Sequence, residues 1–300
     1  MKFLFYFLVF PGFLFSSFLG LLSSWIDRKI TARLQYRVGP RWYQNFIDIA
    51  KLIYKEVIIP ENANSSFIIM PFLGLISSIL VATILGVGIL GYSFVGDVIV
   101  ILYLLLLISV SYIFGAVASS NPIASLGASR EMKLVLSYEL PFIISLITII
   151  IKTRSLQLVD ILKFQNYFKS NIFSFSGFFA FLVSFLCIHA KLGLVPFDVS
   201  EAEQEIMGGI LIEHSGFLLA INKLIKSILF YSLNLFLIVL FLGKDLSFIF
   251  LLFKYLIILV LFILVKNANP RLRIDQIIKF FWGPIFILAI LSLLLTLFGY

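Results

Sequence analysis

Long apolar runs alternate with short polar segments along all 300 residues of the chain. A helix needs roughly 20 apolar residues to cross the hydrocarbon core of a bilayer. Eight runs have about this length, and we expect each to form a spanning helix: Phe3–Ile26, Phe67–Gly91, Val98–Ser119, Glu131–Ile151, Phe173–Lys191, Phe217–Leu242, Ser247–Val265 and Phe281–Phe298. The pattern predicts an all-α polytopic membrane protein, with residues 1–300 forming a single integral-membrane domain.

Basic residues are distributed unevenly between the two sets of loops. The loops after the first, third, fifth and seventh runs hold fourteen: Arg28, Lys29, Arg33, Arg37, Arg41, Lys51, Lys55, Arg130, Lys133, Lys191, Lys266, Arg271, Arg273 and Lys279. The opposite side holds six: Lys2, Lys152, Arg154, Lys163, Lys169 and Lys244. The positive-inside rule predicts a multi-pass protein of the cytoplasmic (inner) membrane, with both termini outside.

The composition excludes several functional classes. Hydrophobic residues make up 61% and charged residues 13%, whereas soluble domains are nearer half apolar and about a quarter charged. The net charge of +8 therefore reflects membrane orientation and not a nucleic-acid partner. One cysteine, Cys187, and two histidines, His189 and His214, leave too few ligands for an iron–sulfur, haem or zinc centre. We expect no cofactor on this chain, a lipid bilayer around it, and redox chemistry in partner proteins.

An acidic loop at 192–216 is the strongest candidate for chemistry. It holds five carboxylates and no Lys or Arg: Asp198, Glu201, Glu203, Glu205 and Glu213. Carboxylates packed this closely repel one another, so some should retain protons near neutral pH. Such groups pass protons or bind cations. The alternative is a solvated loop, but this segment departs from the positive-inside trend of its side.

A second candidate is Glu139, which lies near Arg130 and Glu131 in the sequence and about nine residues into the fourth run, roughly 13 Å along the helix. An ionisable group at this depth is costly and is a functional candidate by default. Pro141 is expected to distort the helix beside it. The alternative is a structural neutralisation of Glu139 by Lys223 or Lys226, which share one face of the sixth run.

The first cytoplasmic loop, at 27–66, combines a basic stretch with a short amphipathic helix. The apolar face of that helix holds Trp42, Phe46, Ile49, Ala50 and Ile53. This spacing is typical of a helix in the plane of the membrane interface. It is compatible with a partner-docking helix and equally with a general membrane-surface helix.

Three motifs in the same order resemble one family. They are Asp27-Arg28-Lys29 with Gln35-Tyr-Arg37-Val-Gly39-Pro40; Leu126-Gly127-Ala128 with Arg130 and Ser137-Tyr138-Glu139; and Pro196-Phe197-Asp198 with Glu201, Glu203, Glu205 and Glu213. With the eight runs, they make most of the chain similar to the membrane subunit shared by respiratory complex I (its subunit 1) and the group 4 membrane-bound nickel–iron hydrogenases.

The resemblance implies a subunit that joins an electron-transfer arm to an ion-pumping membrane arm. It implies ion or proton coupling by Glu139, Asp198, Glu201, Glu203, Glu205, Glu213, Lys223 and Lys226. It implies docking of the cytoplasmic arm by Arg28, Lys29, Arg33, Arg37, Gly39, Pro40 and Arg130. The implied partners are hydrophilic subunits with iron–sulfur clusters, in hydrogenases also a nickel–iron centre, together with antiporter-like membrane subunits and ferredoxin as electron donor.

Departures from the complex I pattern favour one branch of the family. Only Arg41–Ile47 remains where complex I subunits carry a longer insert, and Lys191 and Leu194 stand where an acid and an arginine are common. Ser129–Met132 and Glu201–Ile206 look more like the hydrogenase branch. We therefore expect a ferredoxin-linked, H⁺- or Na⁺-translocating complex of hydrogenase or sulfane-sulfur reductase type. The alternatives are a quinone-site subunit of complex I, a stand-alone secondary ion transporter and a passive membrane anchor.

Overall fold

The computed structural model describes residues 2–299, which form helices and connecting loops, with no strand in that range. The helices, including 3₁₀ and π segments labelled η, are α1 Lys2–Leu8, α2 Phe13–Leu34, α3 Gln44–Ile53, α4 Ser66–Ile89, α5 Asp97–Val117, α6 Pro122–Thr153, α7 Leu158–Tyr167, η1 Asn171–Phe173, α8 Phe175–Lys191, α9 Glu203–Ile206, η2 Gly209–Leu211, α10 Gly216–Phe241, α11 Phe248–Ala268, α12 Ile274–Phe280, η3 Phe281–Ile285 and α13 Phe286–Leu297.

Seven helical stretches within residues 2–299 are long and apolar enough to cross a membrane. The fifth predicted run forms a shorter apolar helix, α8, of 17 residues. At the helical rise this is about 26 Å, a little less than the ~30 Å hydrocarbon core. The all-α, polytopic prediction is confirmed, with α8 as the short eighth apolar helix.

The first predicted run is divided in the structure. Helix α1 ends at Leu8, and α2 begins at Phe13, after Pro11 and Gly12. Proline lacks the amide hydrogen that a continuous helix needs, which explains the break. At its other end α2 continues to Leu34, so the predicted loop at 27–66 begins as helix.

Helix α6 is longer than predicted and runs unbroken through Pro141. It begins at Pro122, where the side chain of Asn121 accepts a hydrogen bond from the Ile123 amide at 2.8 Å. Glu139 therefore lies 17 residues after the first residue of the helix (139 − 122), near its middle and not nine residues from its start. Proline has a larger effect in the last helical stretch, where Pro284 lies inside the π segment η3.

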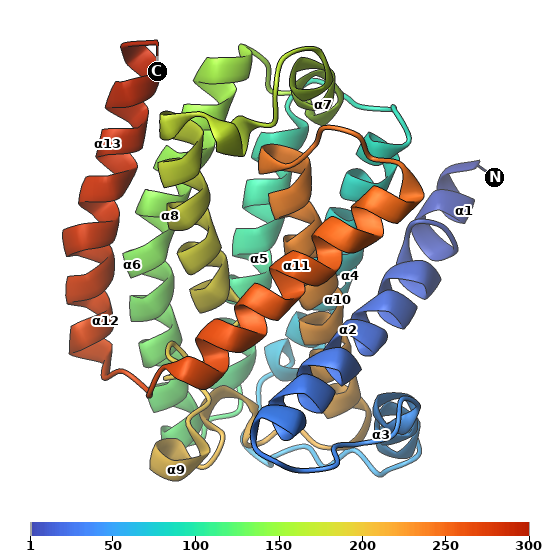
Figure 1. The fold of residues 1–300 in the computed structure, drawn as a ribbon. Coiled ribbons are helices and arrows are strands. Elements are labelled where there is room, and N and C mark those ends of the chain that lie inside the picture. Colours follow the sequence, from blue (N-terminus) through green and yellow to red (C-terminus); the bar gives the residue numbers. More distant parts are fainter. Residues whose placement is uncertain (1, 300) are drawn as a thin grey trace.

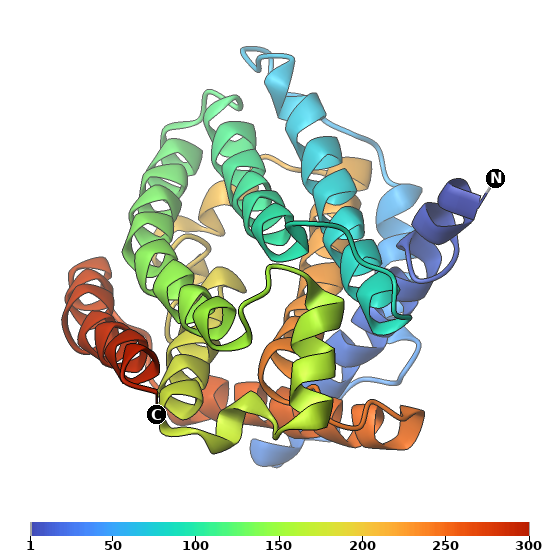
Figure 2. The same ribbon diagram turned by 90° about the horizontal axis from the view of Figure 1, so that it is seen from above.

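Helix α10 forms the centre of the bundle, and most of its residues are buried. Helices α2 and α4 pack against it, while α6, α8 and α13 pack together beside it (Figure 2). Figure 1 shows both chain ends at the same end of the molecule as α7, with α3 and α9 at the opposite end. The first loop and the acidic loop meet there, because the Ile58 amide donates to Ser215 Oγ at 2.8 Å.

Candidate functional site

A buried ion pair joins α6 to α8 inside the bundle. Glu139 Oε2 lies 3.2 Å from Lys191 Nζ, and the two side chains are 13% and 2% exposed. Neither atom has a hydrogen-bond partner within residues 2–299, so the contact is an ion pair held by charge. The Nζ atom also lies 5.4 Å from the ring centroid of Tyr138 and 5.5 Å from that of Phe142. The aromatic faces add cation–π attraction to the carboxylate's charge.

This pair corrects two expectations. The base beside Glu139 is Lys191, and not Lys223 or Lys226 as the sequence suggested. Lys191 is the last residue of α8 and lies inside the protein, whereas the pattern assigned it to a basic cytoplasmic loop. Without Lys191 the loop count on that side is thirteen against six, so the predicted orientation is unchanged.

A second buried acid, Glu131, lies two turns before Glu139 on α6 and is 7% exposed. It borders a small internal cavity of about 30 Å³ whose other polar lining side chains include Lys191, Ser200, Glu201 and Lys226. A water molecule needs about 10–15 Å³ of such volume. The cavity therefore joins ionisable groups from α6, α8, the acidic loop and α10 within one polar pocket.

The acids of the acidic loop point to partners on other elements. The pairs are Asp198–Arg271 at 2.7 Å, Glu201–Lys226, Glu205–Arg130 at 2.5 Å, and a hydrogen bond from Asn121 to Glu213. Glu203 is exposed on α9. Carboxylates that are adjacent in sequence are thus separated in space, and cations from α6, α10 and the α11–α12 connection offset the repulsion expected among them.

Burial shifts the pKa values of two groups in this loop, Asp198 and His214. Burial raises the pKa of Asp198, although Arg271 opposes the shift. Burial also lowers the pKa of His214 from 6.5 to about 4, with the neighbouring Glu213 acting in the opposite direction. The His214 ring packs against Phe67 with the centroids 4.6 Å apart. His214 is therefore neutral at physiological pH and fixes the end of the loop by packing.

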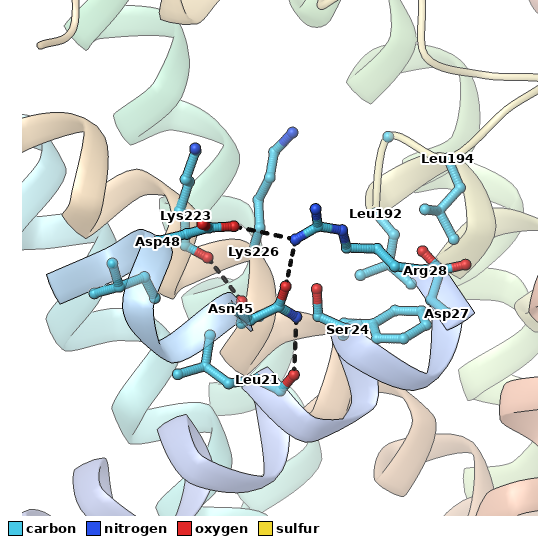
Figure 3. Close-up of a pocket in the computed structure, with 14 residues that line it drawn as sticks. Leu21, Ser24, Asp27, Arg28, Asn45, Asp48, Leu192, Leu194, Lys223 and Lys226 are labelled. Carbon is cyan, nitrogen blue, oxygen red and sulfur yellow. Dashed lines mark hydrogen bonds and ion pairs between the residues drawn. The ribbon is translucent and has the colours of Figure 1, made fainter. Parts of the chain in front are cut away.

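A larger cavity of about 290 Å³ opens at the end of the molecule that holds α3. Its polar lining includes Asp27, Arg28, Asp48, Lys223 and Lys226 (Figure 3). Lys226 borders this cavity as well as the small one. Charged side chains thus line both cavities, from Asp48 and Arg28 at the α3 end, through Lys226, to Lys191 of the Glu139–Lys191 pair.

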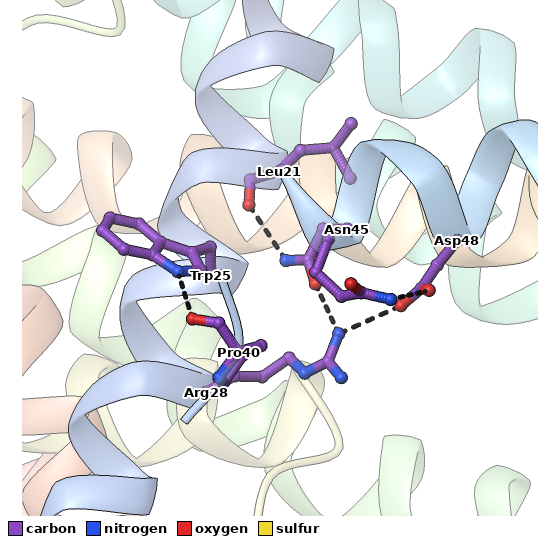
Figure 4. Close-up of polar contacts among 7 residues, drawn as sticks. Leu21, Trp25, Arg28, Pro40, Asn45 and Asp48 are labelled. Carbon is purple, nitrogen blue, oxygen red and sulfur yellow. Dashed lines mark hydrogen bonds and ion pairs between the residues drawn. The ribbon is translucent and has the colours of Figure 1, made fainter. Parts of the chain in front are cut away.

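Arg28 holds α3 against α2 at the edge of this cavity (Figure 4). Its Nη1 donates to Asn45 Oδ1 at 2.5 Å and lies 3.2 Å from Asp48 Oδ2. Asn45 Nδ2 in turn donates to the Leu21 carbonyl at 3.1 Å. The amphipathic helix predicted in the first loop is present, and it is anchored to the bundle by these polar contacts.

The turn at Gly39 and Pro40 is tied to α2. Trp25 Nε1 donates to the Pro40 carbonyl at 3.1 Å, and Lys29 Nζ donates to the Val38 carbonyl at 2.8 Å. Gly39 has a φ of 74°, a conformation that glycine adopts without strain.

The predicted docking residues fall into two groups. Arg28, Lys29 and Arg130 make side-chain contacts within the chain, although Arg28 is itself 47% exposed, whereas Arg33 and Arg37 are exposed and carry no such ion pair within residues 2–299. The exposed pair is therefore the better placed for a contact with a partner, and docking itself stays a prediction. Over residues 2–299, His, Cys, Asp and Glu side chains form no group of three or more that could hold a metal ion.

The chain is similar to one family of known proteins over almost its whole length. The NADH dehydrogenase family pattern matches residues 7–297. An NADH-quinone oxidoreductase subunit of Thermomicrobium roseum is 33% identical over 310 residues, covering 93% of this chain and 91% of that protein. The equivalent protein of Geobacillus sp. (strain WCH70) is 31% identical over 298 residues, covering 90% and 86%.

A similar fold occurs in a solved structure. It is that of the membrane-bound sulfane sulfur reductase, an archaeal respiratory membrane complex. The TM-score is 0.85 at 24% identity, covering 94% of this chain and 96% of the other. The likeness therefore extends over nearly all of the bundle.

Proposed function

Because the chain belongs to the NADH dehydrogenase family and is a membrane subunit of a complex I-like oxidoreductase, we propose that it couples electron transfer in a partner arm to ion movement in the membrane arm. The arm would bind at the end that holds α3 and α9, where the exposed Arg33 and Arg37 lie. Partner subunits would hold the iron–sulfur clusters, and antiporter-like subunits would adjoin the bundle.

The observation that carries this proposal is the buried Glu139–Lys191 pair, next to a cavity that also borders Glu131, Glu201 and Lys226. A buried pair is stable while both members are charged, and it loses its Coulomb energy when Glu139 binds a proton. A charge change at the larger cavity would therefore alter the stability of the charged pair through the intervening ions. This gives two states that differ in ion affinity, which coupling requires.

We further infer the ferredoxin-linked branch, of hydrogenase or sulfane-sulfur reductase type, from residues of this chain. Complex I subunits commonly carry an acid at the position of Lys191, next to the acid that corresponds to Glu139. In this chain the two positions form an acid–base pair. The larger cavity is bordered by five charged side chains and also by Leu21, Ile49, Leu192, Leu194 and Phe230, so the branch is inferred from Lys191 and not from this lining. A quinone-site subunit is the second candidate, since the relatives named above are NADH-quinone oxidoreductase subunits.

The first test is Glu139→Gln in the assembled complex in inverted membrane vesicles. Gln keeps the shape of the side chain but leaves the buried Lys191 without its acid, so the complex is first checked for intact assembly. In the assembled complex we expect electron transfer from reduced ferredoxin to persist while ion accumulation is lost. Asp160→Asn, on α7 at the opposite end of the bundle, where its side chain is 44% exposed, is the control and should retain both. Normal ion accumulation in the Glu139→Gln complex would remove this pair from the mechanism.

A second test decides the branch, and uses mass spectrometry of the subunits that co-purify with the chain in mild detergent. A large partner with two Cys-x-x-Cys pairs indicates a nickel–iron hydrogenase. The same partner with altered pairs indicates a sulfur- or quinone-reducing relative. Recovery of the chain alone, with ion transport in liposomes, would instead support a secondary transporter.

A further inference from the structure

The end of the bundle opposite α3 carries an open cavity of about 490 Å³ between α7 and the start of α8. Its lining includes two basic side chains, Lys152 and Lys169, and, beside Phe164, the exposed aromatic rings of Tyr167, Phe168 and Phe173. These rings are 85%, 68% and 78% exposed. Tyrosine at the end of a bundle of spanning helices is typical of the headgroup region of a bilayer, and exposed phenylalanine rings beside it would lie against the adjoining apolar part of the lipid.

The two lysines lack an acidic partner within the part of the chain that the structure describes. Lys152 Nζ donates to Ser174 Oγ, which in turn donates to the Asn171 carbonyl at 2.8 Å. An ammonium group has three donors, so Lys152 keeps further donors for a ligand while Ser174 fixes its position. Lys169 is exposed and lines the same cavity.

The distribution of charge on this side of the protein is uneven. Of the six basic residues that the sequence assigns to this side, Lys152, Arg154, Lys163 and Lys169 fall within 18 consecutive residues (169 − 152 + 1). Lys163 forms an ion pair with Asp160 on α7, at 3.5 Å, and does not line the cavity. Arg154 lines a separate cavity, so the two lysines that share this cavity without an acidic partner in the described chain are Lys152 and Lys169.

We propose that this cavity binds the headgroup of an anionic phospholipid. Lys152 and Lys169 would contact the phosphate, and the exposed rings of Tyr167, Phe168 and Phe173 would lie among the headgroups and upper acyl chains. Charge complementarity selects an anionic over a zwitterionic lipid, because basic residues near a membrane surface attract negative headgroups. The cavity is at the opposite end from the proposed coupling site, so lipid binding there serves to anchor α7 and is independent of the proposed function.

The test places a photo-crosslinker, p-benzoylphenylalanine, at position 173 of the chain in its purified complex. The complex is reconstituted in nanodiscs of phosphatidylcholine with a minor share of phosphatidylglycerol, irradiated, and analysed by mass spectrometry of the labelled peptide. We expect phosphatidylglycerol adducts above the share of that lipid in the disc. Lys169→Gln should lower the enrichment about fivefold, and the double variant Lys152→Gln with Lys169→Gln further.

Lys163→Gln is the matched control, since it removes an exposed lysine on α7 that does not line the cavity. It should leave the enrichment unchanged. The double variant removes the hydrogen bond from Lys152 to Ser174 and could therefore misfold. Lys169→Gln alone keeps this hydrogen bond, so the single variant decides the result. Adducts in the bulk ratio, an equal loss in the control, or crosslinking to a neighbouring protein in place of lipid would each overturn the proposal.

Discussion

At the scale of single residues, the main feature is that a membrane-buried acid is matched by one lysine. Moving either charge alone into the bundle costs several kcal/mol, whereas the two together offset much of that cost. Lys191 gains further from the rings of Tyr138 and Phe142. The ion pair of Glu139 and Lys191 therefore contributes to packing in the bundle, and in the proposed function the loss of one of its charges distinguishes the two states.

Removing only the lysine should be strongly destabilising. In Lys191→Met, the Glu139 carboxyl remains buried without its base, and we expect a loss of about 3–5 kcal/mol of stability. The double variant Lys191→Met with Glu139→Leu should recover most of it, because no uncompensated charge remains. Thermal unfolding of the purified complex measures both, with the exposed Lys163→Met as control. Equal stability of the single and double variants would contradict a paired role.

His214 predicts a pH dependence for the end of the acidic loop. Its pKa falls from 6.5 to about 4 on burial, so the unfolded segment binds a proton that the folded one resists. Stability is therefore complete above pH 6.5 and decreases as the pH falls toward 4, by up to about 3 kcal/mol. Hydrogen exchange of residues 207–215 should accelerate on going from pH 7.5 to 5, after correction for intrinsic rates. His214→Gln should show a smaller change, and an identical pH response in both proteins would exclude His214 as the cause.

The sequence identified Glu139, but not its partner Lys191 and not the burial of Glu131. Glu139 interrupts an apolar run, which is a local signal. Lys191 ends a helix and precedes Gly193, and it looks like an ordinary loop lysine until α8 is seen to end inside the protein. Hydropathy places Glu131 at the start of a run, because it does not reveal that α6 extends back to Pro122. Pairing across helices depends on tertiary packing, which the local pattern does not contain.

At the scale of elements, the first third of α6 acts as a platform for the acidic loop. A side-chain carbon at Gly127 would lie 2.7 Å from the Ile210 amide nitrogen and 2.9 Å from the Gly209 carbonyl carbon. Only glycine lets α6 and η2 approach this closely. This gives a physical reason for the glycine in the Leu126-Gly127-Ala128 motif, which the sequence alone offered only as a resemblance.

Gly127→Ala should displace η2 and loosen the acidic loop. The added methyl group meets backbone atoms that cannot rotate away, and overpacking of this kind costs about 1–3 kcal/mol. We expect faster hydrogen exchange over residues 206–213 and weaker ion coupling. Gly283→Ala is the control, because a side-chain carbon there meets no atom of the described chain within 4 Å. Unchanged exchange in Gly127→Ala would show that the loop is not held by this contact.

Most elements were predictable, and their ends were not. Apolar length located seven long helices and α8, because membrane burial requires it. The extension of α2 to Leu34 carries polar residues, such as Asp27 and Arg28, that pair with other parts of the protein. The extension of α6 back to Pro122 packs small residues against η2. Neither stretch is an uninterrupted apolar run, so hydropathy assigned both to loops. The chain breaks between α1 and α2 beside Pro11, whereas Pro141 lies in an unbroken helix. A proline therefore marks a candidate break without deciding it.

At the scale of the whole molecule, one end gathers the charged contacts that link distant segments. Arg271, after α11, pairs with Asp198, and the Leu272 amide donates to the Pro196 carbonyl at 3.1 Å. Lys266 pairs with Asp27 of α2 at 2.7 Å. A partner arm bound at this end would thus contact a surface connected by ion pairs to α2, α11 and the acidic loop, while the opposite end carries α7 and both chain ends (Figure 1).

The charge bias predicts that the end with α3 and α9 faces the cytoplasm. Cysteine labelling tests this with the native Cys187, which is buried, replaced by Ala. Lys163→Cys on α7 should react with a membrane-impermeant maleimide in intact cells, because its side chain is 64% exposed at the end that we expect outside. Lys51→Cys on α3, also exposed, should react only after the membrane is opened or in inverted vesicles. The opposite labelling pattern would mean that positive charge does not set the orientation here, and the electron-transfer arm could not then bind at the α3 end, since ferredoxin is cytoplasmic in the proposed function.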